Sequence, residues 1–78
     1  HAGYRIYPCA DGRVAVAALE PHFAARLCEA AGLPAQGDME HMRAPATHEA
    51  IARFLLGHAR HELTALAQAR DIPLHALH

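Results

Sequence analysis

The stretch from Cys9 to Pro34 constrains the fold more than any other part of the chain, because it specifies a turn, a strand and a helix in direct succession. Val14–Leu19 alternates between two sets of side chains, which is typical of a strand with one buried face. Tyr4–Tyr7 alternates in the same way. The pair Asp11-Gly12 lies between the two runs and favours a tight turn, because Gly tolerates positive φ. We therefore expect an antiparallel β-hairpin.

A helix is expected directly after this hairpin. Glu20-Pro21 opens it, since Pro suits the first helical position, where its missing N–H needs no partner. An apolar stripe at helical spacing follows, made of Phe23, Leu27 and Ala31, with Ala24 and Cys28 beside it. Gly32 is expected to end the helix, and Pro34 prevents its resumption.

The second half of the chain predicts two more helices and a short strand. Residues 35–45 show no clear period and contain Gly and Pro, so we expect a loop there. Thr47 can cap a second helix, whose apolar positions recur at helical spacing: Ile51, Phe54, Leu55 and His58. A third helix is expected over Arg60–Arg70, and Asp71–Leu74 is expected to form a strand that Pro73 keeps at an edge or an end.

The predicted fold class is therefore α+β, in a single domain that spans residues 1–78. Its small antiparallel sheet consists of the N-terminal hairpin plus a short C-terminal strand, packed with three helices. Hydrophobic residues make up 53% of the chain, which is enough for a core even without Trp.

The charge balance and the apolar pattern exclude two classes of partner. The formal net charge is −1, whereas nucleic-acid binding needs a basic face. No apolar run is long enough to span a membrane.

The two cysteines, Cys9 and Cys28, favour a reduced cytoplasmic pair over a disulfide. Because the chain begins at His1 without an initiator Met, we expect a piece of a longer protein or a tag remnant.

The ordered series of these features resembles the small domain of the family III CoA-transferases, the group that includes formyl-CoA transferase and alpha-methylacyl-CoA racemase. The similarity is sharpest over Tyr7–Pro34. Ala59–Leu63 is similar to the start of the family's last helix, and Asp71–Pro73 to the strand that follows it. The chain departs from the family where aromatic residues are common, at the Arg13–Val14 junction, Ala24 and Leu63. The resemblance thus indicates a divergent member.

The resemblance gives Glu20 a catalytic role. In the racemases of this family a Glu-Pro pair occupies the same strand-to-helix joint, which implies that Glu20 assists a His–Asp pair supplied by a large domain. The chemistry would be removal and return of a proton beside a thioester carbonyl. In the transferase branch, an Asp of the large domain forms acyl-enzyme intermediates instead. Position alone leaves another reading open, in which Glu20 only complements the positive end of the helix.

The resemblance also implies the partners. These are the large domain of the parent protein, a second subunit, and acyl-CoA, a coenzyme A thioester, as the parent's substrate. No cofactor is expected on this chain, and no catalysis by it alone. The alternative is a stand-alone protein-interaction module without acyl-CoA chemistry.

Other polar residues are weaker candidates. The pairs His58/His61 and His75/His78 are spaced i, i+3 and match no standard zinc site, so no metal is predicted. Cys28 falls on the apolar helix stripe and is expected to be packed, and Asp11 is expected to be only a turn residue. Three arginines could meet CoA phosphates, although their spacing does not distinguish them from an ordinary solvated surface: Arg5, Arg13 and Arg43.

Overall fold

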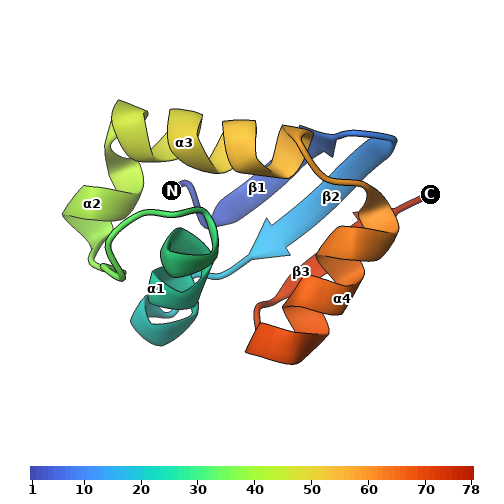
Figure 1. Ribbon diagram of the computed structural model, residues 1–78. Coiled ribbons are helices and arrows are strands. Elements are labelled where there is room, and N and C mark those ends of the chain that lie inside the picture. The colour runs from blue at the N-terminus through green and yellow to red at the C-terminus, as the bar shows by residue number, and fades with distance from the viewer.

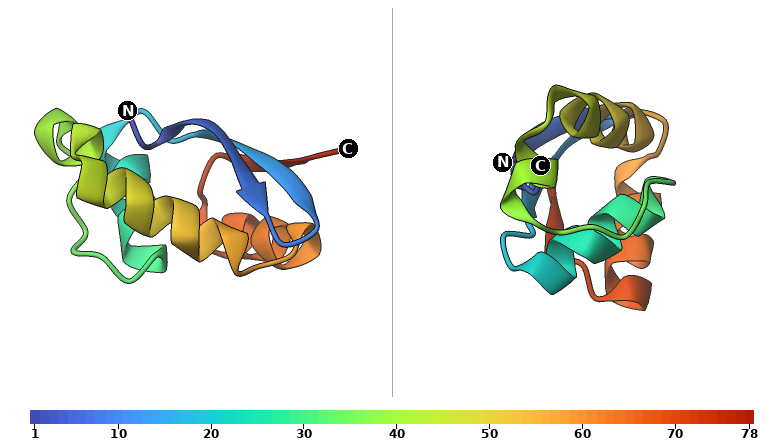
Figure 2. Two further views of the ribbon diagram at one scale, coloured as in Figure 1. Left: turned by 90° about the horizontal axis from the view of Figure 1, so that it is seen from above. Right: turned by 90° about the vertical axis from the view of Figure 1, so that its left-hand side faces the viewer.

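Three antiparallel strands form one sheet in the order β1-β2-β3, and the helices gather on one of its faces (Figures 1 and 2). The computed structural model describes residues 1–78. Its elements, in chain order, are β1 (Tyr4–Cys9), β2 (Gly12–Ala17), α1 (Pro21–Ala30), α2 (Met39–Arg43), α3 (Pro45–Leu56), α4 (Arg60–Arg70) and β3 (Leu74–Leu77). The α+β class and the antiparallel sheet are confirmed, with four helices where three were expected.

The N-terminal hairpin forms, but its turn differs from the expected one. Cys9 pairs with Gly12, so the two-residue loop is Ala10-Asp11 and Gly12 already belongs to β2. Gly12 does not have positive φ, and the expectation of a turn that needs it was wrong. A Cβ at Gly12 would lie 3.1 Å from Cδ of Arg60. The absence of a side chain therefore leaves room for the arginine of α4.

Helix α1 begins and ends close to where the sequence predicts. Pro21 occupies its first turn, and Glu20 is the N-cap residue in an extended conformation. Gly32 has φ of +81°, a left-handed conformation that suits Gly just beyond a helix end. Leu27 and Cys28 are fully buried, which confirms the packed role of Cys28.

The expected loop at residues 35–45 instead contains the five-residue helix α2. Asp38 is its N-cap, and the Asp38 carboxylate accepts a hydrogen bond from the His41 N–H at 3.1 Å. The cap expected at Thr47 was also wrong. Helix α3 begins at Pro45 with Ala44 as its N-cap, and Thr47 lies inside the helix with 3% of its surface exposed.

The C-terminal strand is shifted along the chain relative to the prediction. Helix α4 has the expected bounds, but Asp71 adopts a left-handed conformation with φ of 54°. Pairing with β2 begins only at Leu74, after Pro73, and continues to Leu77. The strand does lie at a sheet edge, where Pro is tolerated because a free edge needs no N–H partner.

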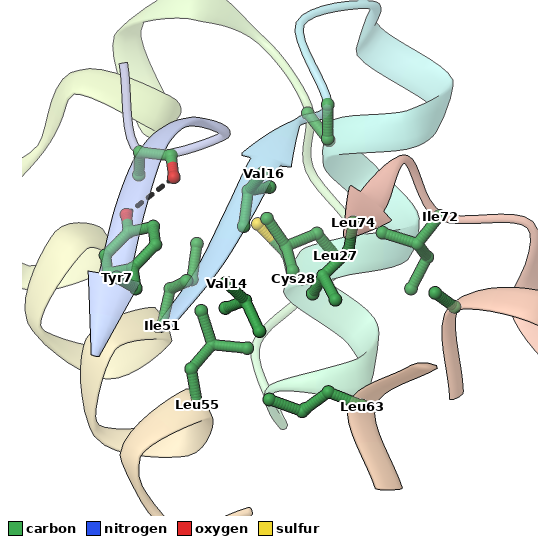
Figure 3. Packing of buried hydrophobic residues seen from close by; sticks show 14 of the residues in the cluster. Tyr7, Val14, Val16, Leu27, Cys28, Ile51, Leu55, Leu63, Ile72 and Leu74 are labelled. Carbon is green, nitrogen blue, oxygen red and sulfur yellow. Dashed lines mark hydrogen bonds between the residues drawn. The ribbon is translucent and has the colours of Figure 1, made fainter. Parts of the chain in front are cut away.

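The hydrophobic core lies between the sheet and the helices (Figure 3). Side chains of β2 point toward those of α1, α3 and α4, and the largest fully buried ones are Leu27, Met42, Ile51, Leu55, Leu63, Val14 and Cys28. Tyr7 is buried on β1, and its hydroxyl donates a hydrogen bond to the carbonyl of Ala2 at 2.6 Å. None of the four helices combines the length and apolarity needed to cross a bilayer.

No helix covers the opposite face of the sheet. Tyr4 and Ile6 of β1 point to that face, opposite to the buried Tyr7, and are 61% and 52% exposed. Ile6 pairs with Ala15 of β2 and Tyr4 with Ala17, so small side chains lie beside the large ones. These four residues, named here the outer sheet face, line a shallow hollow of about 540 Å³ with their neighbours.

Candidate functional site

Glu20 lies at the junction where β2 delivers the chain to α1. Its side chain is 66% exposed and makes no capping hydrogen bond to the helix, although Glu20 is the N-cap residue. Its one ionic neighbour is His22, whose Nε2 lies 3.5 Å from Oε2 of Glu20. The carboxylate therefore lies near the positive end of α1, where its charge is favourable, but it makes no hydrogen bond to the helix.

The side chains around Glu20 make the first turns of α1 both aromatic and basic. The rings of His22 and Phe23 lie 4.0 Å apart between centroids. The guanidinium of Arg26 lies 5.5 Å from the centroid of Phe23 on the same helix, and Arg26 Nη1 is 3.2 Å from the Asp71 carboxylate. Glu20 thus has a protonatable imidazole next to it and a cation two turns along the helix.

Gly37 packs against the start of α1. A Cβ at this position would lie 2.7 Å from the carbonyl carbon of Pro21 and 3.0 Å from the N atom of Ala25. No side chain fits in that space. The backbone before α2 therefore supports the turn that carries Glu20, a contact that sequence periodicity did not reveal.

The surroundings of Glu20 do not form a complete reaction site. None of the four surface hollows includes Glu20 in its lining. An exposed carboxylate can orient an imidazole from another protein segment and stabilise its protonated form. It cannot by itself bind a substrate or exclude water from it.

The chain is similar to one known protein family over its full length. The model of CoA-transferase family III matches residues 1–78, the whole chain. The chain belongs to CoA-transferase family III. No curated protein matches it. Membership confirms the resemblance seen in the sequence and implies coenzyme A thioesters as the substrates of the family.

In this family III chain, Asp11 does more than form a turn. Its Oδ1 accepts a hydrogen bond from the backbone N–H of Arg60 at 2.8 Å and lies 3.5 Å from the Arg60 Nε. The carboxylate thereby caps α4 from the hairpin, while Glu62 accepts from the N–H of Ala59 at 2.8 Å. The pKa of Asp11 is lowered, first by the Arg60 backbone hydrogen bond and also by the Arg60 charge.

Neither cysteine lies where a nucleophile would be expected. Both thiols are free and buried. The Sγ of Cys28 lies 3.4 Å from Sδ of Met42, and burial, followed by the charge of Asp38, raises the pKa of the Cys28 thiol. The Cys9 thiol is directed to Asp11 at 3.7 Å. With its raised pKa, the Cys28 thiol carries little of the reactive thiolate.

The histidines singled out in the sequence do not assemble into a cluster. Nδ1 of His58 lies 2.9 Å from the Phe54 carbonyl, and the two rings are 4.7 Å apart. His61 and His78 line a hollow of about 430 Å³ beside Asp11. The structure brings together no set of three or more His, Cys, Asp or Glu side chains that could hold a metal ion.

Proposed function

We propose that this chain is the small domain of a family III CoA-transferase or 2-methylacyl-CoA racemase, where it helps to cover the acyl-CoA site and is not catalytic alone. The observation that carries the proposal is the carboxylate of Glu20. It is exposed at a helix N-terminus and bonded to no backbone group of its own helix. Because no backbone N–H of the helix occupies this carboxylate, its oxygens are available to accept a hydrogen bond from a side chain of another domain.

Glu20 would act on a histidine of the large domain. During removal of the proton beside the thioester carbonyl, that histidine becomes positively charged, and a nearby carboxylate stabilises the charge and orients the ring. The proton then returns to the same carbon. In a transferase, where a large-domain Asp carries the acyl group, Glu20 would contribute only to the electrostatics of the covered site.

The partners in this proposal are the large domain and a second subunit. The outer sheet face supports them, because it exposes Tyr4 and Ile6 beside small side chains with no helix of this chain above them. Uncovered apolar surface of this kind marks a protein interface. With two free, buried thiols, the chain suits a reducing compartment such as the cytoplasm.

An amide NMR titration of the chain, first with CoA and then with an acyl-CoA, tests the proposal. We expect saturable shifts at Glu20 and along α1. The variant Glu20→Gln should change the size or the ligand dependence of these shifts, whereas Glu40→Gln, on the separate helix α2, should not. Absence of shifts at millimolar acyl-CoA would show that this chain contributes nothing to the acyl-CoA site.

The second candidate function is a stand-alone interaction module without acyl-CoA chemistry, and the outer sheet face is the observation that favours it. The two functions differ in how the isolated chain behaves. A domain cut from its parent should self-associate through the uncovered face, whereas a natural module should be a monomer or a defined oligomer. Sedimentation over a concentration series separates these outcomes.

A further inference from the structure

The ion pairs of this chain divide its arginines into two groups. Arg26, Arg53, Arg60 and Arg70 each pair with a carboxylate. No ion pair is formed by the other three, which are Arg5, Arg13 and Arg43. Unpaired guanidinium groups leave their donors free for an external anion, and their planar fork matches carboxylate and phosphate oxygens.

Two of the unpaired arginines line the same groove. It has a volume of about 560 Å³ and lies between β1, which provides Arg5, and the junction of α2 and α3, which provides Arg43. Arg13 lines none of the surface hollows. The fold thus brings Arg5 and Arg43, 38 positions apart in the sequence, to one concave surface.

The two guanidinium groups that line the groove outnumber its one carboxylate. Glu49 lies in the lining, but its Oε1 is bonded to Nη2 of Arg53 at 2.8 Å. Helix α3 begins in the same lining, at Pro45, and no side chain caps its N-terminus. The positive end of the α3 dipole therefore adds to the field of the two guanidinium groups.

Arg5 is held in position before any ligand arrives. Its Nη1 lies 3.2 Å from Nδ1 of His48, and its guanidinium lies 5.3 Å from the centroid of the Tyr7 ring. Tyr7 is itself anchored through its hydroxyl. A side chain ordered in advance loses less conformational entropy on binding.

His48 lies in the lining of the groove beside Arg5, and its pKa is lowered. Burial is the first cause of this shift, and the positive charge of Arg5 adds to it. The imidazole is therefore expected to be neutral near pH 7. A neutral imidazole keeps one N–H group, which can donate a hydrogen bond to a ligand oxygen.

We propose that this groove is an anion site that takes the phosphate group of a small molecule, bound by Arg5 and Arg43. The proposal follows from the charge and shape of the groove alone. It does not rest on the role of Glu20, which lines no part of the groove. Two sources of the phosphate fit this chemistry, inorganic phosphate itself and the phosphorylated end of a nucleotide.

The test is an amide NMR titration of the chain with inorganic phosphate at constant ionic strength, repeated with adenosine 5′-phosphate and with adenosine 3′,5′-bisphosphate. Constant ionic strength matters because salt screens surface charges over about 10 Å. We expect saturable shifts at the residues lining the groove. Tighter binding of either nucleotide than of phosphate would identify a nucleotide as the ligand, and equal binding would identify free phosphate.

Three matched variants decide whether the groove or the overall charge is responsible. Arg5→Gln and Arg43→Gln should each weaken phosphate binding by about five-fold or more, because each removes a charge-assisted contact. Arg13→Gln removes the same charge outside the groove and should change binding less than about two-fold. Equal losses in all three variants, or no saturable shift in the unmodified chain, would overturn the proposal. Arg43 is exposed on the surface, so its variant tests the site even if Arg5→Gln disturbs folding.

Discussion

Truncation of Leu55 should reveal how much of the stability of this small fold depends on α3. Leu55 is fully buried, whereas its neighbour Leu56 is 54% exposed. Replacement of Leu by Ala removes three carbon atoms at either position. At about 0.8 kcal/mol for each buried carbon, the transfer cost is about 2.4 kcal/mol at Leu55 and about half of that at Leu56.

The cavity left at Leu55 adds to its transfer cost. Leu→Ala changes at fully buried sites cost about 2.7–5 kcal/mol, and a chain of this length has a total stability of about 4–12 kcal/mol. Leu55→Ala should therefore remove a large part of the free energy of unfolding. Leu56→Ala should cost only about 1 kcal/mol, because water already reaches that side chain.

Urea unfolding followed by circular dichroism measures both variants under the same conditions. If Leu55→Ala leaves no cooperative transition, Ile51→Val provides a milder probe of the same helix face, since Ile51 is also fully buried. Its cost should be about 0.5–1.5 kcal/mol. Equal losses for Leu55→Ala and Leu56→Ala would refute the assignment of the buried face of α3.

Three further changes test particular contacts. Gly37→Ala should destabilise the chain by about 1–3 kcal/mol because its Cβ would meet the backbone of α1, whereas Gly57→Ala, whose Cβ would lie 3.6 Å from the nearest atom, should be neutral or slightly stabilising in a thermal melt. Tyr7→Phe should cost about 1–3 kcal/mol in urea unfolding, because it removes the hydroxyl that satisfies a buried carbonyl. Folding lowers the pKa of Asp11 below its ordinary value of 3.8. The stability that the Asp11 carboxylate contributes is therefore complete above pH 3.8 and is lost as the pH falls through the lower pKa of the folded chain. Urea midpoints at neutral and acid pH should therefore differ less for Asp11→Asn than for the unmodified chain, and an identical difference would contradict the role of Asp11 as a cap for α4.

The candidate site was only partly visible in the sequence. The Glu20-Pro21 pair indicated a helix start, and the structure places Glu20 at that start with its carboxylate free. The supporting contact of Gly37 with Pro21 could not be predicted, because it joins a loop to a helix that no periodic pattern relates. One missed feature did have a local signal, since Asp38 is a preferred N-cap residue for the short helix α2.

The sequence by itself determined the elements whose signals are local. Alternation over β1 and β2, the stripe on α1 and the left-handed Gly32 follow from side-chain periodicity and backbone sterics, which act over a few residues. Only the tertiary structure decided which distant groups meet. Asp11 caps a helix 49 residues away, and Arg5 and Arg43 share a groove while Arg13 does not. The reason is physical: local conformation depends on neighbouring residues, whereas pairing of charges and caps depends on how the packed elements place them in space.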